Sequence, residues 1–319
     1  MEKANRNVFI GATYDYDRAK VVLFGAGADA TTSYRPGTRF GPAAIRAESY
    51  GIETYSPYQD RDLEDFPFYD SGDLEFPFGS PARQLEAIET RAGEILDDGK
   101  IPFMLGGEHL VTLGAVRAAF KRFPGLRIIH FDAHADLREE YLGETLSHAT
   151  VMRRCYDLLG DGRIFQFGIR SGTREEFAFM KAGHVIAEKF TCKGVEKLSW
   201  NSAEKLSCCD VSTPQRLSVS TPVYLTIDLD VLDPADFPGT GTQEAGGLHY
   251  DELRCAITDI LTRFHVVALD NVELNPSLDP SGRSTALACK FLRECLLALS
   301  GAAGRWFPQN DQCDKSVPA

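Results

Sequence analysis

The stretch HFDAHADLR, residues 130–138, alternates potential metal ligands with small residues directly after an apolar run. Asp132, His134 and Asp136 stand two positions apart, so in extended backbone their side chains point to the same side. Carboxylates placed so close together repel each other unless a cation lies between them. A solvated acidic turn is the plainer alternative, but three potential ligands within five residues make it a poor one. This spacing predicts a metal site at the end of a strand.

A further histidine follows a second apolar run. His109 comes after IPFML, residues 101–105, and a pair of glycines that let the backbone turn tightly. Taken alone, a histidine at such a position is more often structural or solvated than a ligand. His130 lies in the body of its own strand-like run, and we interpret it as structural.

Carboxylates also lie late in two other apolar runs. Asp228 and Asp230 share one face at the end of VYLTIDL, residues 223–229. A buried carboxylate at such a place needs a cation or several hydrogen bonds. Glu273 lies between apolar neighbours near the end of residues 265–274, where a structural salt bridge explains it equally well.

Apolar runs alternate with helical patterns along the whole chain. We expect strands at residues 20–26, 101–105, 127–131, 163–169, 184–187, 223–229 and 265–274. We expect helices at residues 82–96, 110–121, 148–159, 173–182, 250–263 and 282–299. This alternation predicts an α/β fold with a mostly parallel sheet covered by helices. No repeat or linker divides the chain, so we expect a single domain over residues 1–319, with roughly the first 15 and last 18 residues peripheral.

Ligands of open parallel sheets collect at the carboxyl ends of the strands, so the candidate residues are expected to meet there. The candidate metal ligands are His109, Asp132, His134, Asp136, Asp228 and Asp230. Six ligands exceed those of one tetrahedral site, and bridging carboxylates would let them hold two ions. Oxygen-rich ligation favours a hard ion such as Mn²⁺ over zinc or copper. Two ions about 3.5–4 Å apart could share and activate one hydroxide at neutral pH.

The charge of the predicted site and of the chain indicates a cationic substrate. The summed negative charge of four aspartates, Glu273 and a hydroxide exceeds the positive charge of two dications, so the site has a net negative charge. The chain of 319 residues carries a net charge of −12, which argues against nucleic acid or anionic lipid as a partner. It has no apolar run of the roughly 18 residues that a membrane span needs, and no signal peptide. None of its eight cysteines forms a C-x-x-C pair, so we expect reduced thiols, a cytoplasmic location and no special role for Cys208 and Cys209.

Five motifs occur in the order and spacing of the ureohydrolases, the family of the arginases and agmatinases, which the chain therefore resembles. They are GGEH (106–109), DAHAD (132–136), IDLDVLDP (227–234), PGTGT (238–242) and VELNP (272–276). The resemblance implies a three-layer αβα fold around an eight-stranded mostly parallel sheet. It also implies two Mn²⁺ per chain and assembly into homotrimers or homohexamers.

The resemblance further implies which residues would bind each metal ion and which would act on the substrate. One manganese would be held by His109, Asp132, Asp136 and Asp228, and the other by His134, Asp132, Asp228 and Asp230. A bridging hydroxide would attack the carbon of a guanidinium group and release urea and an amine. Glu273 would orient the substrate and His148 would relay a proton to the leaving amine, so that both act in catalysis together with Asp136.

The loop at residues 137–146 bears on the choice of guanidine. It carries three glutamates and lacks the serine- and asparagine-bearing pattern with which arginases hold the α-carboxylate and α-amino group. Acidic side chains there would repel a carboxylate and attract a distal amine, so the chain is most similar to agmatinases, which release putrescine and urea. Arginine, guanidinobutyrate and aminopropylagmatine remain alternatives, as do a one-zinc deacetylase of related fold and a catalytically inactive binding protein.

Overall fold

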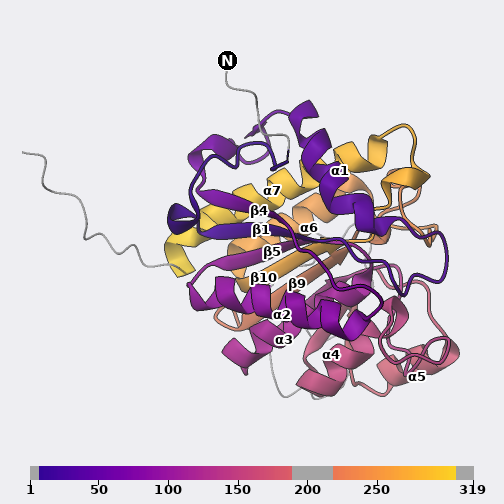
Figure 1. The fold of residues 1–319 in the computed structure, drawn as a ribbon. Helices are drawn as coiled ribbons and strands as arrows, with labels where there is room; N and C mark the ends of the chain where they lie inside the picture. Colours follow the sequence, from indigo (N-terminus) through magenta and orange to yellow (C-terminus); the bar gives the residue numbers. More distant parts are fainter. Residues whose placement is uncertain (1–6, 189–217, 307–319) are drawn as a thin grey trace, which may run out of the picture.

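An eight-stranded sheet runs through the centre of the computed structural model, which describes residues 7–188 and 218–306 (Figure 1). Its strands are β1 (Val21–Ala26), β4 (Phe68–Asp73), β5 (Ile101–Gly106), β6 (Arg127–Phe131), β7 (Ile164–Phe167), β8 (Ile186–Glu188), β9 (Pro222–Asp228) and β10 (His265–Val272). Their order across the sheet is β4-β1-β5-β10-β9-β6-β7-β8, and every pair is parallel. A short antiparallel hairpin, β2 (Tyr55–Ser56) and β3 (Arg61–Asp62), lies outside this sheet.

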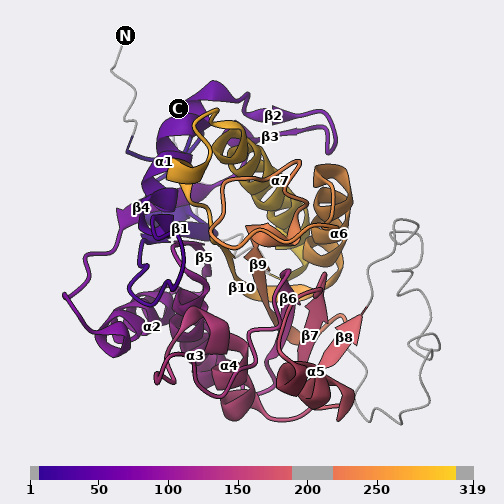
Figure 2. The same cartoon turned by 90° about the vertical axis from the view of Figure 1, so that its right-hand side faces the viewer.

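Helices cover both faces of the sheet. They are α1 (Gly41–Glu48), α2 (Pro81–Asp97), α3 (Thr112–Arg122), α4 (Val151–Leu159), α5 (Arg174–Lys181), α6 (Tyr250–Arg263) and α7 (Arg283–Trp306). One apolar core lies between the sheet and α1, α6 and α7, and a second lies between the sheet and α2, α3 and α4 (Figures 1 and 2). These three layers confirm the predicted αβα architecture, with an entirely parallel sheet.

The strands form where the sequence is continuously apolar, because both of their faces are covered. Every residue of β1, β5, β6 and β7 is buried. The helices bury only one stripe, as in α2, where the buried side chains are Leu85, Ile88, Ala92, Ile95 and Leu96. This stripe is the face expected from the helical pattern at residues 82–96.

Strand β4, helix α1 and the β2–β3 hairpin were not predicted from the sequence. Strand β4 has the sequence FYDSGD, and its polar second half interrupts the apolar pattern that marks the other strands. Helix α1 has only eight residues and follows a proline- and glycine-rich stretch. Most of the internal stretch at residues 190–220 falls outside the described residues, as do Cys208 and Cys209.

The order of the strands decides where the candidate ligands meet. The chain passes from β5 through α3 to β6, and β9 and β10 later fill the space between these two strands. The four central strands β5, β10, β9 and β6 are therefore neighbours, and their carboxyl ends point to one edge of the sheet. Such a crossover point in a parallel sheet leaves a crevice at the strand ends in which ligands bind.

Within the described ranges 7–188 and 218–306, no helix combines the length and apolar composition of a membrane span. Helix α7 is long enough, but its sequence includes Lys290, Arg293 and Glu294.

Gly107 allows the turn after β5 to lie directly against the turn after β1. A Cβ atom at Gly107 would stand 2.0 Å from the carbonyl oxygen of Ala28, and both lie in backbone that has little room to move. We expect Gly107→Ala to lower the free energy of unfolding by about 1–3 kcal/mol, since an added methyl must displace packed backbone. Urea unfolding followed by circular dichroism would measure this.

Gly93 offers the matched control, because it lies inside α2 with open space on its outer side. Apart from its own helix backbone, no atom of the described residues lies within 4 Å of the position that a Cβ atom would take. There the same change should stabilise the protein by roughly 0.5–1 kcal/mol through helix propensity. Equal effects of the two substitutions would contradict the close approach at Gly107.

Candidate metal centre

A pocket of about 250 Å³ opens at the carboxyl ends of the central strands. The predicted site residues that line it are His109, His134, Asp136, His148, Asp228, Asp230 and Glu273. Asp132 has no exposed surface, and its carboxylate contacts the imidazoles of His109 and His134. The fold thus brings together all the residues that the sequence singled out for this site.

The first cluster of potential ligands surrounds one ring nitrogen of His109, which begins the short 3-10 helix η5 (His109–Val111) after β5. His109 Nδ1 lies 3.0 Å from Asp132 Oδ2, 3.1 Å from Asp136 Oδ2 and 3.4 Å from Asp228 Oδ2. These oxygens come from the ends of β6 and β9, so the first cluster joins three strands.

The second cluster surrounds His134. Its Nδ1 lies 2.8 Å from Asp230 Oδ2 and 3.5 Å from Asp132 Oδ1. Ligand atoms of Asp132, His134 and Asp230 all lie within 4.8 Å of one another, as a metal ion would require. The two clusters share Asp132, which turns one carboxylate oxygen toward each histidine.

His130 is also close to Asp132, and both of its ring nitrogens are occupied. Gln166 Nε2 donates to the carbonyl of Ala135 and to His130 Nδ1, at 2.8 and 3.0 Å. Nδ1 is therefore an acceptor, and Nε2 carries the hydrogen that it donates to Asp132 Oδ2 at 2.8 Å. His130 lies within reach of a metal cluster, but it orients Asp132 instead of offering a free lone pair, which agrees with the structural role predicted for it.

Two of the predicted residues sit in strained backbone. Asp136 has φ of 53° and Glu273 has φ of 66°, both in the left-handed region that side chains other than glycine seldom adopt. Each follows the end of a central strand, where the turn aims its side chain into the pocket. Strain of this kind persists where the surrounding structure holds it, and it is concentrated at functional sites.

Burial makes the four carboxylates hard to ionise together. It raises the pKa of Asp136 to about 7 and that of Asp228 well above its usual range, and the neighbouring carboxylates add to both shifts. Burial and the Asp132 charge likewise raise the pKa of Asp230. Asp132 alone keeps a pKa well below normal, because its interactions with His109 and His130 outweigh burial. Positive charge at the centre would let all four ionise.

The surroundings of His109 fit a metal ion. Its Nδ1 is buried and makes no hydrogen bond, although three carboxylate oxygens lie within 3.4 Å. A buried ring nitrogen without a hydrogen-bond partner and facing carboxylates is the donor set that binds a divalent cation.

Glu273 and His148 are positioned at the same pocket by backbone contacts. Glu273 Oε1 accepts a hydrogen bond from the backbone N–H of His109 at 2.7 Å. His148 begins the 3-10 helix η6 (His148–Thr150), and its Nδ1 donates to the carbonyl of Thr31 at 3.0 Å. Since a carbonyl can only accept, Nδ1 carries the hydrogen, and Nε2 keeps the lone pair. Burial lowers the pKa of His148 to about 4, so the imidazole is neutral near pH 7.

The loop after the D-x-H-x-D motif differs from expectation. The acidic residues Glu139, Glu140 and Glu144 do not line the pocket, and Glu139 pairs with Arg153 at 3.0 Å on the surface. The residues of this loop that do line the pocket are Arg138 and Tyr141. The prediction of an acidic mouth formed by this loop is therefore wrong, because sequence alone does not show which side chains turn inward.

Glu176 of α5 supplies the negative charge that the sequence did not assign. Its carboxylate lines the pocket, accepts a hydrogen bond from the backbone of Leu137 at 2.8 Å and lies 3.7 Å from Arg138 Nε. The Arg138 guanidinium also stacks 4.6 Å from the centre of the Tyr141 ring. Glu176 also forms a capping box with Thr173 at the start of α5.

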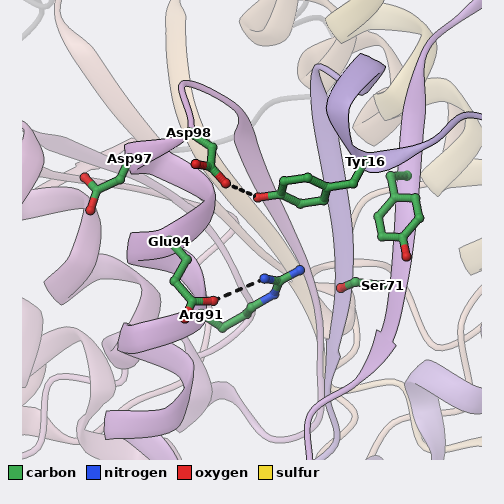
Figure 3. A pocket seen from close by; sticks show the side chains of 7 residues that line it. Tyr16, Ser71, Arg91, Glu94, Asp97 and Asp98 are labelled. Carbon is green, nitrogen blue, oxygen red and sulfur yellow. Dashed lines mark hydrogen bonds and ion pairs between the residues drawn. The ribbon is translucent and has the colours of Figure 1, made fainter.

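A second hollow, of about 710 Å³, lies beside the amino ends of β1 and β5 (Figure 3). Four of its titratable groups pair with one another. Tyr16 donates to Asp98 Oδ2 at 2.6 Å, and Arg91 pairs with Glu94 at 3.2 Å. None of the predicted ligands lies there, so we assign the chemistry to the pocket at the carboxyl ends.

The neutral state of His148 makes a prediction about stability in the metal-free chain. The unfolded chain takes up a proton at His148 near its normal pKa of 6.5, whereas the folded chain does so only near 4. The contribution of neutral His148 to the free energy of unfolding is therefore fully present above pH 6.5 and is lost as the pH falls toward 4. Between about pH 7 and about pH 5 the wild type should lose about 2 kcal/mol more than His148→Asn. Urea unfolding at both pH values measures this, and equal losses would contradict a neutral buried imidazole.

Comparisons with known proteins agree with this geometry. A family model described as the arginase family matches residues 19–298. An agmatinase from Bacillus cereus is 46% identical over 297 residues, which cover 93% of this chain and 97% of the relative. An agmatinase from Halalkalibacterium halodurans is 44% identical over 301 residues, which cover 93% of this chain and 98% of the relative. The crystal structure of an agmatine ureohydrolase of Thermoplasma volcanium is 33% identical with a TM-score of 0.81, covering 93% of this chain and 96% of that chain. The chain therefore belongs to the arginase family of binuclear metal hydrolases and is a ureohydrolase.

Proposed function

We propose that this chain is an agmatinase, which hydrolyses agmatine to putrescine and urea at a dimanganese centre. The observation that carries the proposal is the pair of ligand clusters that share Asp132 beside the Glu273 carboxylate. The names of the relatives that cover nearly the whole chain support agmatine as the substrate.

Six residues would hold the two ions. One ion would be held by His109, Asp136 and Asp228, and the other by His134 and Asp230. Asp132 would bind both ions. Asp228 would be a second bridge, as the family resemblance implies. Four carboxylates and two imidazoles favour manganese over softer ions. When bound, the ion pair would lower the pKa of a coordinated water and so supply a nucleophile at neutral pH.

Glu273 would bind and orient the guanidinium group. Its carboxylate is held by the His109 backbone and lines the pocket beside the ligand clusters. Paired hydrogen bonds from guanidinium N–H groups to a carboxylate fix both the position and the plane of the substrate. Burial and the nearby Glu108 raise the pKa of Glu273, so a cationic substrate would favour its ionised form.

His148 would move the proton. Its Nδ1 is committed to the Thr31 carbonyl, so Nε2 is the atom that can accept a proton in the pocket and pass it to the leaving amine. The low pKa of His148 means that the proton does not stay there, which suits a relay.

One observation favours a second candidate substrate. Arg138 lines the pocket, and a guanidinium there could bind a carboxylate such as that of 4-guanidinobutyrate. Against this, Arg138 already faces the buried Glu176 carboxylate and the Tyr141 ring. We therefore place agmatine first. Two carboxylates would be available to its distal amine: Glu176, which lines the pocket, and Glu244, whose Oε1 lies 3.7 Å from His134 Nε2.

We also propose, from the family resemblance, assembly into homotrimers or homohexamers of single-domain chains. Analytical ultracentrifugation would test the assembly. A cytoplasmic location is supported by the cysteines of the described residues, which are all free thiols.

Removing the shared ligand should empty the whole centre. We expect Asp132→Ala and Asp132→Asn to lose both ions, because each cluster loses a carboxylate and its neighbours lose their shared partner. Metal analysis after reconstitution with Mn²⁺ should give two ions per chain for the wild type and fewer than one for the variants, with circular dichroism to check the fold. Asp251→Ala, an exposed aspartate on α6, is the control and should keep both ions. Two tightly held ions in Asp132→Asn would contradict the bridge.

Urea release from four guanidines would test the substrate. We expect kcat/KM to be highest for agmatine, ahead of aminopropylagmatine, 4-guanidinobutyrate and arginine. Arg138→Met should leave the agmatine value unchanged or higher, since it removes a like charge near a dication. If 4-guanidinobutyrate were the substrate, the same change would lower its kcat/KM by at least about tenfold through the lost carboxylate contact. Faster turnover of arginine or 4-guanidinobutyrate than of agmatine by the wild type would overturn our choice.

A further inference from the structure

A buried network of hydroxyl groups connects His109 to Asp270, a carboxylate that lies outside the pocket. His109 Nε2 lies 3.0 Å from Thr226 Oγ1, and Thr226 Oγ1 donates to Asp270 Oδ1 at 2.7 Å. Thr226 on β9 and Asp270 on β10 are direct partners in the sheet, so the backbone pairing holds the two side chains together. None of the three side chains is more than 1% exposed.

Two further hydroxyl groups complete the surroundings of Asp270. Tyr224 and Thr112 both donate to its Oδ2, at 2.6 and 2.8 Å. The carboxylate thus accepts three hydrogen bonds, two on one oxygen and one on the other. A buried carboxylate needs such donors to remain ionised. An ionised carboxylate carries no hydrogen, so its oxygens can only accept hydrogen bonds.

The direction of each hydrogen bond follows from this arrangement. A threonine hydroxyl has one hydrogen, and Thr226 commits it to Asp270. Toward His109, Thr226 can therefore only accept, so His109 Nε2 carries the ring hydrogen. In the neutral imidazole the other nitrogen then keeps its lone pair, and this is the buried Nδ1 that faces Asp132, Asp136 and Asp228 without a hydrogen bond.

We propose that Thr226 and Asp270 are positioning residues of the metal centre, which fix the ring tautomer and orientation of His109 so that Nδ1 is presented as a ligand. The inference rests on the proposed dimetal site, since a tautomer matters there only if His109 binds a metal. Carboxylates that orient metal-binding histidines usually accept the ring N–H directly. Here a threonine hydroxyl on β9 carries the effect from a carboxylate on the neighbouring strand β10.

Metal affinity of the protein, not only its activity, tests the proposal. Thr226→Val keeps the shape of the side chain and removes the acceptor for His109 Nε2. We expect it to weaken Mn²⁺ binding at one of two sites roughly 10- to 100-fold, the range found when a partner of a metal-binding histidine is lost. Thr226→Ser keeps the hydroxyl and should restore the wild-type affinity. Titration calorimetry on the metal-free protein, with free Mn²⁺ counted by electron paramagnetic resonance, gives both the affinity and the number of sites.

Asp270→Asn tests the hydrogen bonds between Asp270, Thr226 and His109 separately from packing, because it leaves the side-chain volume almost unchanged. The two donors at the Oδ2 position hold the amide oxygen there and turn the NH₂ group toward Thr226. Thr226 must then accept from the amide and donate to His109 Nε2, which reverses the tautomer. We expect a loss of Mn²⁺ affinity like that of Thr226→Val, again roughly 10-fold or more.

Thr112→Val is the matched control. It removes an equally buried hydroxyl that donates to the same carboxylate and lies 3.4 Å from Thr226 Oγ1, and it leaves the contact between Thr226 and the His109 ring in place. Its Mn²⁺ affinity should stay within about threefold of the wild type. Wild-type affinity in both Thr226→Val and Asp270→Asn, or an equal loss in Thr112→Val, would overturn the proposal. A wild type that binds no Mn²⁺ would instead overturn the dimetal site itself, so the two failures are distinguishable.

Discussion

Four carboxylates in a buried space need positive charge, and the rest of the site depends on this requirement. Asp132, Asp136, Asp228 and Asp230 lie at the ends of only two strands, β6 and β9, which are neighbours in the sheet. Burial raises the pKa of three of them, so the protein alone does not keep the cluster ionised. Two dications would balance the four negative charges, and the same two ions would activate a water molecule for hydrolysis.

The backbone prepares these carboxylates before any ion binds. In three of the four aspartates one oxygen accepts a backbone N–H: Asp132 from His134 at 2.6 Å, Asp228 from Asp230 at 2.8 Å, and Asp230 from Ala133 at 3.0 Å. The other oxygen of Asp228 and of Asp230 is left to face a histidine, and Asp132 faces one with each of its oxygens. Side chains outside the pocket act similarly on the ligands, since His130 orients Asp132 and Thr226 contacts His109. Preorganisation of this kind lowers the entropic cost of binding each ion.

Much of this site could be predicted from the sequence, because its ligands follow apolar runs that form the buried strands. The period of two in D-x-H-x-D and D-x-D shows which side chains share a face, and strand ends show where they meet. The sequence could not show that β9 and β10 lie between β5 and β6, since strand order depends on tertiary packing. Strand β4 escaped notice because a polar half replaces the apolar run.

The residues around the substrate were harder to predict than the ligands. The loop at 137–146 appeared acidic, yet its inward side chains are Arg138 and Tyr141. The acid that faces them, Glu176, comes from a helix whose sequence shows only a capping pattern. Loop side chains have no fixed period, so their direction is set by contacts that only the folded chain provides.

Anomalous X-ray diffraction at the manganese absorption edge, from crystals of the Mn²⁺-loaded protein, would show whether two ions share Asp132. We expect two peaks about 3.5–4 Å apart, one beside His109 Nδ1 and one beside His134 Nδ1, with the carboxylate of Asp132 between them. A single peak, or two peaks that do not share Asp132, would contradict it.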